Sequence, residues 1–155
     1  MEDLIGNESI QREYSGESGI FIIDTANPVP NDGQINGIGG YFLGTTEVVV
    51  KLLRPMGKDY IITDSKKLSF DIEKAGKTHV DFENPLIVKK GDILAFYFPK
   101  SVTVPYDTGL GTNAYSEMKE DEYESGVKIS ADDFIQASKI KRKYSLNYYG
   151  IFFQN

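Results

Sequence analysis

The chain of 155 residues contains no Cys, no Trp and a single His. Without Cys it cannot carry thiol catalysis, thiolate zinc sites, iron–sulfur clusters or redox dithiols, although the redox compartment itself stays open. A single His also excludes a multi-histidine metal site. The aromatic residues are ten Tyr and nine Phe, and Tyr prefers a wet edge where its ring is covered and its hydroxyl is not.

Positive charge is also scarce, because 17 Lys and Arg stand against 23 Asp and Glu, a net charge of -6. Binding to a phosphate backbone depends on clustered Lys and Arg, so we expect no nucleic-acid partner. No apolar run approaches the length of a membrane-spanning helix, and the first residues lack the basic and apolar pattern of a signal peptide. We therefore expect no membrane insertion. A cytoplasmic protein and a piece of a longer exported chain both fit this N-terminus.

The residue types that are plentiful favour strands. Ile, Val and Thr together number 33, whereas Ala and Leu number 15, and branching at Cβ favours a pleated backbone. Short apolar runs alternate with Gly, Pro, Asn and Asp at the spacing of a sandwich or barrel. The length fits one domain over residues 1–155, with residues 1–15 as an extended N-terminal arm. We therefore predict an all-β protein: an antiparallel β-sandwich of jelly-roll type, with at most one short helix.

Individual runs refine this prediction. Residues 68–72 alternate between apolar and polar, as a strand with one face in water does. Residues 93–98 are apolar throughout, which predicts a central strand covered on both faces and ended by Pro99. Residues 102–104 form a further short apolar run that we predict to be a strand. The only helical candidate is 130–138, where Ser130 could cap the first turn, and two short strands are the alternative.

Exposed aromatic residues beside polar side chains are what a sugar-binding surface needs, because a sugar ring stacks on an aromatic ring while its hydroxyls bond to Asp and Asn. The candidate ligand-binding residues are Tyr41, Tyr106, Asp107, Asn113 and Tyr115. The alternative is that these Tyr residues only close the rim of the core. The sequon Asn7-Glu8-Ser9 matters only in a protein secreted by a eukaryote.

Calcium is the metal ion that this sequence is best able to bind, because calcium prefers hard oxygen ligands and often stabilises the loops of β-sandwiches. Asp24, Asn27 and Asp32 are the candidate ligands, with Asn31 between them. The spacing is not that of an EF-hand. The alternative is that these side chains only make hydrogen bonds within turns.

Catalysis has one candidate motif. Asp107-Thr108-Gly109 is similar to the catalytic loop of aspartic proteases, in which two such loops bring two carboxylates together to share a proton. The partial second copy, Asp24-Thr25-Ala26, has Ala where the tight loop needs Gly. His79 and Asp81 alternate onto one strand face, but no Gly-x-Ser-x-Gly turn accompanies them, which favours a surface histidine over a Ser-His-Asp triad. We expect no enzyme. A hydrolase using Asp107 and a second carboxylate is the weakest alternative.

Three segments, Phe21–Gly33, Val48–Pro55 and Val88–Tyr97, resemble the strand and turn pattern of jelly-roll modules of extracellular, glycan-active and phage-tail proteins. The resemblance covers roughly residues 20–110, and its most distinctive piece is Val88-Lys89-Lys90-Gly91-Asp92 before an apolar strand. It implies a non-catalytic binding or attachment module for a carbohydrate or a cell-surface polymer, in an extracellular or virion-associated assembly.

The alternative implied by the same resemblance is a trimeric head of the C1q and tumour-necrosis-factor type. Similar turns occur in those jelly rolls, and residues 148–153 suit the last strand of such a subunit. In that case aromatic residues pack between the subunits of a homotrimer.

Overall fold

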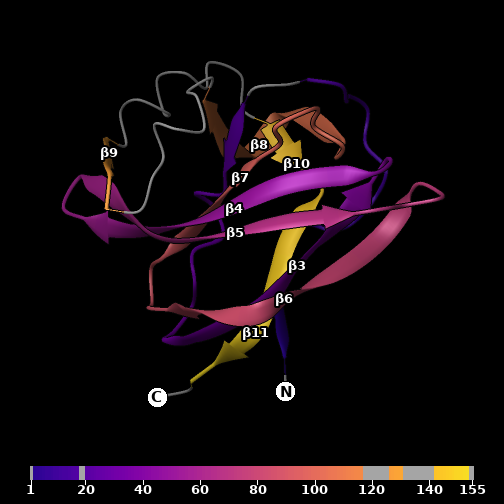
Figure 1. Ribbon diagram of the computed structural model, residues 1–155. Helices are drawn as coiled ribbons and strands as arrows, with labels where there is room; N and C mark the ends of the chain where they lie inside the picture. Colours follow the sequence, from indigo (N-terminus) through magenta and orange to yellow (C-terminus); the bar gives the residue numbers. More distant parts are fainter. Residues whose placement is uncertain (1, 18–19, 117–125, 131–141, 154–155) are drawn as a thin grey trace.

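The computed structural model describes residues 2–17, 20–116, 126–130 and 142–153, and for residues 109–116 it describes the backbone alone. In these parts the chain forms strands and no helix, which confirms the all-β prediction (Figure 1). The strands are β1 (Asp3–Gly6), β2 (Phe21–Ile23), β3 (Gly33–Phe42), β4 (Thr46–Met56), β5 (Asp59–Phe70), β6 (Gly76–Val88), β7 (Ile93–Tyr97), β8 (Tyr106–Ser116), β9 (Lys128–Ser130), β10 (Arg142–Tyr144) and β11 (Leu146–Phe152). No helix in these parts is long and apolar enough to span a membrane.

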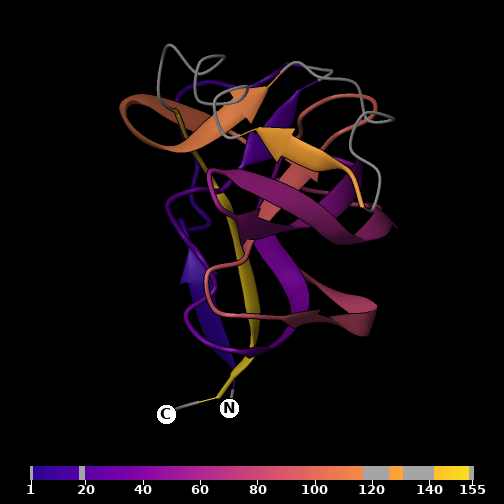
Figure 2. The same cartoon turned by 90° about the vertical axis from the view of Figure 1, so that its left-hand side faces the viewer.

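The strands form two antiparallel sheets packed against each other, as a β-sandwich (Figures 1 and 2). The small sheet has four strands in the order β1-β11-β3-β6, and the large sheet has seven in the order β10-β8-β2-β7-β4-β5-β9. The main core lies between them and is filled from both sides, for example by Ile38 and Tyr148 from the small sheet and Val50 and Phe96 from the large one. Because the first and last strands pair, both ends of the chain lie at the same end of the molecule (Figure 1).

Four antiparallel strand pairs are nested along the chain. β4 pairs with β5, β3 with β6, β2 with β7, and β1 with β11. Between β7 and β11 the chain adds strands at the two edges of the large sheet: β8 and β10 extend it beyond β2, and β9 extends it beyond β5.

The predicted central strand is confirmed. β7 is the fourth of the seven strands in the large sheet. Leu94 and Phe96 point into the main core, whereas Ile93 and Ala95 belong to a second apolar cluster on the other face of the same sheet. Polar side chains on a strand covered by apolar residues on both faces would be buried without partners. This explains the uninterrupted apolar sequence of β7.

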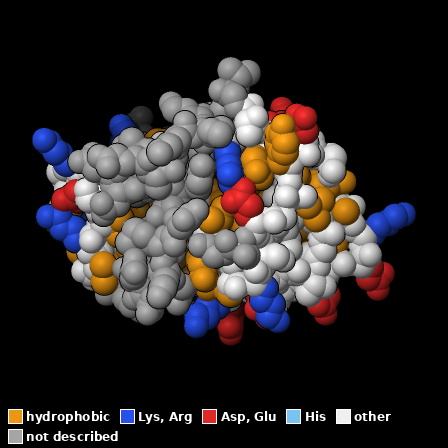
Figure 3. All heavy atoms as spheres, turned by 90° about the horizontal axis from the view of Figure 1, so that it is seen from above, with side chains coloured by type: hydrophobic (Ala, Val, Ile, Leu, Met, Phe, Trp, Pro, Cys, Tyr) orange, Lys and Arg blue, Asp and Glu red, His pale blue; other side chains and the backbone are white. Residues whose placement is uncertain are grey.

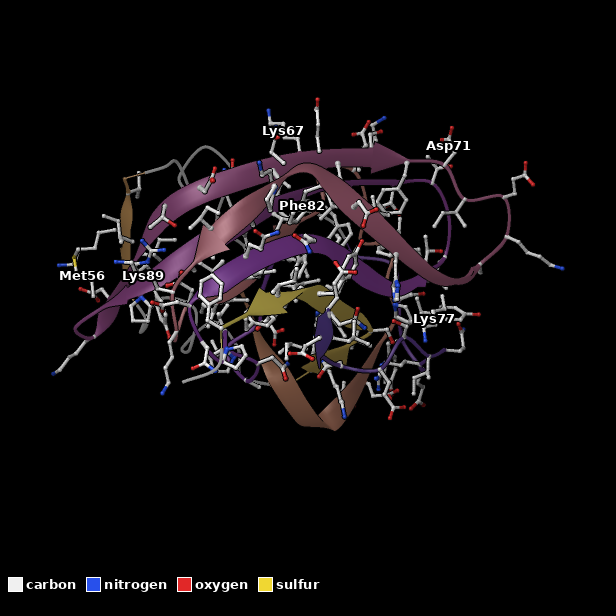
Figure 4. The ribbon with its side chains drawn as sticks, turned by 90° about the horizontal axis from the view of Figure 1, so that it is seen from below. Met56, Lys67, Asp71, Lys77, Phe82 and Lys89 are labelled. Carbon is white, nitrogen blue, oxygen red and sulfur yellow. The ribbon has the colours of Figure 1, made fainter. Side chains whose placement is uncertain are left out.

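The predicted alternation of residues 68–72 is also confirmed. Leu68, Phe70 and Ile72 pack against the main core, while Ser69 and Asp71 are exposed. Viewed from below, Lys67 projects away from β5, with Met56 and Lys89 at one end of the sandwich and Asp71 and Lys77 at the other (Figure 4). Viewed from above, charged side chains stand mainly at the rim, with hydrophobic ones between them (Figure 3).

Three segments differ from simple expectation. Residues 102–104 are not a strand, so that prediction was wrong: their backbone bonds to loops, with Val102 N–H donating to Glu17 C=O (2.7 Å) and Leu43 N–H to Thr103 C=O (2.7 Å). Of the proposed helix 130–138, Ser130 is the last residue of β9 and the rest lies outside the described residues. Within the N-terminal segment 1–15, residues 3–6 pair with β11 as an edge strand.

Candidate functional site

The outer face of the small sheet carries two rows of residues that are register partners across its four strands. One row is Leu4, Tyr149, Gly37 and Asp81, and the next is Gly6, Asn147, Gly39 and His79. Register partners point to the same side of an antiparallel sheet, so each row presents its side chains together. The prediction that His79 and Asp81 share one face is confirmed.

Glycines form the floor of these rows. A Cβ added at Gly37 would lie 2.3 Å from the hydroxyl oxygen of Tyr149 and 2.3 Å from the carbonyl oxygen of Val80. The absence of a side chain therefore lets the Tyr149 ring lie flat across β3 and reach β6. At Gly39 the same position is taken by Asn147 Oδ1, at 2.3 Å, and by the ring of His79.

Tyr149 donates a short hydrogen bond from its hydroxyl to Asp81. Only 8% of Tyr149 is exposed. Burial raises the pKa of Tyr149 above its ordinary value, and the hydrogen bond to Asp81 and the negative charges of Asp81 and Glu2 act in the same direction. The hydroxyl therefore stays protonated and holds Asp81 in place. The His79 ring lies beside it, with a centroid separation of 5.3 Å.

A cavity of about 300 Å³ opens at this place, lined by Glu2, Asp3, Leu4, His79, Asp81 and Tyr149. Glu2 is held by a chain of hydrogen bonds in which Gln34 donates to Asn36 (2.7 Å) and Asn36 donates to Glu2 (2.7 Å). Two of the carboxylates in the cavity are thus fixed by neighbours before any ligand arrives. Preorganised polar groups around a small concavity are the usual features of a binding site.

Asn147 lies beside the cavity and is 1% exposed. Its amide nitrogen donates to Asn7 C=O (2.7 Å) and to Ser9 Oγ (2.9 Å), which fixes the orientation of the amide. Its oxygen, Oδ1, is consequently turned over Gly39 toward the ring of His79 and has no hydrogen-bond partner. Buried acceptors without a donor are uncommon in folded proteins.

A larger cavity of about 540 Å³ lies on the large sheet, lined by Glu47, Val48, Val49, Lys67, Leu68, Ser69, Tyr97 and Pro99. Its lining is mainly apolar, and its carboxylate, Glu47, is paired with the exposed Lys100 at 3.3 Å. We therefore consider the cavity of the small sheet the better candidate.

Tyr106 and Asp107, predicted to bind a ligand, are adjacent on β8 but their polar groups are used within the protein. Asp107 accepts hydrogen bonds from Arg12 Nη1 (3.0 Å) and from the backbone N–H of Glu13 (3.0 Å). These bonds, the one from Glu13 first, lower the pKa of Asp107. Tyr106 donates to Glu17 (3.1 Å), and its ring lies under the Arg142 guanidinium, 4.4 Å from the centroid. Here the pair anchors the N-terminal segment to β8.

The structure does not bring the other predicted ligand residues to one place. Tyr41 lies on β3 of the small sheet, where it is register partner of Lys77. Asn113 and Tyr115 lie on β8 of the large sheet, and their side chains are outside the described residues.

The predicted calcium ligands divide in a similar way. Asn27 Nδ2 donates to Asp24 Oδ1 at 2.7 Å, so the oxygen of the Asn27 amide is turned away from Asp24. Asp32 accepts a hydrogen bond from the backbone N–H of Lys90 (2.9 Å). These bonds match the alternative of turn-stabilising side chains. Among the described residues, no three His, Asp or Glu side chains gather as a metal site would require.

The sequence analysis did not identify Tyr149, Glu2 or Asp3 as site residues. Two signals in the sequence pointed to Tyr149. Gly37 and Gly39 are two apart on one strand, and Gly on one strand face marks a close approach of another group. The end of the chain alternates between core residues and outward ones, Asn147 and Tyr149 among the latter.

Comparison with protein-family models, with curated proteins and with solved structures finds no match. The arguments for function therefore rest on the geometry of this chain.

Proposed function

We propose that the protein is a non-catalytic binding module for a carbohydrate or another cell-surface polymer, in a secreted or viral assembly. The binding site is the cavity on the outer face of the small sheet. The observation that carries this proposal is the convergence of Tyr149, Asp81 and Glu2, each held by a hydrogen bond, over a floor of glycines. Carboxylates that are held in place accept hydrogen bonds from hydroxyl or amino groups at little cost in entropy.

We also propose that the sandwich is a jelly roll. The nested pairs β1·β11, β2·β7, β3·β6 and β4·β5 support this, because wrapping such a nest of antiparallel pairs around a core produces two sheets with Greek-key connections. In this interpretation β8, β9 and β10 are an insertion before the last strand.

A non-catalytic role is supported by the state of Asp107, the residue in the one catalytic motif. A general acid needs a pKa raised toward neutrality, whereas the hydrogen bonds from Glu13 and Arg12 lower that of Asp107.

A pull-down with insoluble polysaccharides and a glycan array tests the proposal. We expect the purified protein to bind one class of polymer. Tyr149→Phe, which removes the hydrogen bond to Asp81, should weaken this binding about tenfold. Tyr14→Phe is the matched control, because Tyr14 is 43% exposed, stacks on Tyr106 of the large sheet and does not line the cavity. No binding to any polymer, or equal losses in both variants, would contradict the proposal.

A trimeric or protein-binding head is the second candidate, and one observation favours it. Ile87 and Ile151 are aligned across the small sheet through Gln34, and they are 69% and 39% exposed. Leu4 and Phe153 are exposed as well. Exposed apolar side chains on one sheet face are typical of protein interfaces. Light scattering decides between the candidates: a trimeric mass that Ile87→Asp converts to a monomer would favour the head.

A further inference from the structure

The cavity of about 540 Å³ on the large sheet lies on the face turned away from the main core. Lys67 on β5 and Tyr97 on β7, which both line it, are register partners of Val49 on β4. Register partners point to the same side of a sheet, so these three side chains form one row in the cavity lining. The Tyr97 ring stacks on the buried Phe21, with a centroid separation of 4.7 Å, which fixes this part of the lining in place.

Most of the cavity lining is apolar. The residues that supply this surface are Val48, Val49, Leu68, Tyr97 and Pro99. The cavity volume lies within the range of about 300–1,000 Å³ that is typical of small-molecule sites. Removing apolar surface from water is favourable, so the lining selects a ligand with an apolar body. An alkyl chain or a hydrocarbon ring meets this requirement better than a sugar, whose hydroxyl groups would lose hydrogen bonds to water.

The charged residues of the lining, Glu47 and Lys67, include one cation without a partner. Glu47 already pairs with Lys100, at 3.3 Å. In the described part of the chain, by contrast, the side chain of Lys67 forms no ion pair and no hydrogen bond. It is exposed and projects away from β5 (Figure 4). Its ammonium group, which carries three N–H donors, is therefore available to an anionic group of a ligand.

From the apolar lining and this unpaired ammonium group we infer that the cavity binds an organic anion, an alkyl chain or hydrocarbon ring that carries one carboxylate. The apolar body of the ligand packs against Val49 and the Tyr97 ring, and its carboxylate accepts hydrogen bonds from Lys67. Hydrogen bonds between charged groups are stronger than those between neutral ones. The inference goes beyond the proposed function, because this cavity lies on the other sheet and takes a different class of ligand.

Nuclear magnetic resonance titration of the ¹⁵N-labelled protein with octanoate, octan-1-ol and octylammonium tests the inference, because these probes share one alkyl chain and differ in charge. We expect octanoate to shift the amide signals of β4, β5 and β7 around the cavity. It should bind about fivefold more tightly than octan-1-ol, since an exposed ion pair contributes up to about that factor. Octylammonium should bind more weakly than either. Equal affinity for octanoate and octylammonium, no binding of octanoate, or shifts confined to other strands would overturn the inference.

Lys67→Gln separates the ion pair from the apolar contacts. We expect this variant to weaken octanoate binding about fivefold and to leave octan-1-ol binding unchanged. Lys77→Gln is the matched control, since Lys77 is an exposed cation on β6 and does not line this cavity. Ser69→Phe, at an exposed position of the lining, should block both ligands by filling the cavity. A thermal melt checks that all three variants fold. Equal losses in the two lysine variants, or unchanged binding in Ser69→Phe, would contradict the inference.

Discussion

Replacing Asp92 by Asn should lower the free energy of unfolding by about 3 kcal/mol. Asp92 has no exposed surface and ends the polar turn before β7. It accepts hydrogen bonds from Arg54 Nε (3.1 Å) and Nη2 (2.9 Å) and from the backbone N–H of Lys89 (2.9 Å). Asn keeps the shape but has one oxygen, so its amino group must face one of these donors.

The size of the loss follows from what is left unpaired. A hydrogen bond to a charged group contributes about 1.5–3 kcal/mol, and breaking one partner of a buried pair costs about 3–5 kcal/mol. Arg54 is 31% exposed and regains some hydration, which places the estimate at the low end of the second range. For a chain of this length, the loss corresponds to a fall in Tm of about 10 °C.

Thermal and urea denaturation followed by circular dichroism at pH 7 measures this loss. Glu47→Gln is the control, because Glu47 pairs with Lys100, whose side chain is 79% exposed, and exposed pairs contribute under about 1 kcal/mol. If Asp92→Asn costs less than about 1 kcal/mol, or no more than the control, the turn does not depend on this ion pair and the reasoning is refuted.

Three other changes have defined outcomes. Asp107→Asn should destabilise the protein at pH 7, because the folded-state pKa of Asp107 is lowered and its charged form therefore stabilises the fold. This stabilisation is lost when Asp107 is protonated, so the difference in stability between variant and wild type should shrink as the pH falls below about 4. Urea denaturation at several pH values measures this difference. Gly37→Ala should cost about 2 kcal/mol or more and abolish ligand binding in the pull-down, because its Cβ would lie 2.3 Å from the carbonyl oxygen of Val80. Ser145→Ala should cost about 1–3 kcal/mol in the same melts, because buried Oγ donates to Ile10 C=O (2.6 Å) and accepts from Arg12 (2.6 Å).

One physical reason explains where the structure places the predicted calcium and sugar-binding residues. A cluster such as Asp24, Asn27 and Asp32 is visible in the sequence. Whether its side-chain oxygens converge on one point depends on the backbone and side-chain donors with which they form hydrogen bonds. Asp24 accepts a hydrogen bond from Asn27, and Asp32 accepts one from the backbone N–H of Lys90, 58 residues away. Asp107 likewise accepts a hydrogen bond from Arg12, which is 95 residues distant along the chain.

The sequence by itself determined the features that short-range patterns encode. Branched side chains and regularly spaced turn residues predict strands, alternation predicts which face of β5 is buried, and the unbroken apolar run of β7 predicts a central position. Each of these depends on neighbours within a few residues. The same logic placed His79 and Asp81 on one side of their strand.

The tertiary structure alone decided what meets on the outer face of the small sheet. Tyr149 reaches Asp81, 68 residues earlier, only because β11 and β6 flank β3 in a register that puts Gly37 between them. A shift of one residue would turn Tyr149 into the core and Tyr148 to solvent. Register between strands that are distant in sequence is set by the packing of the whole core, and no local pattern carries that information.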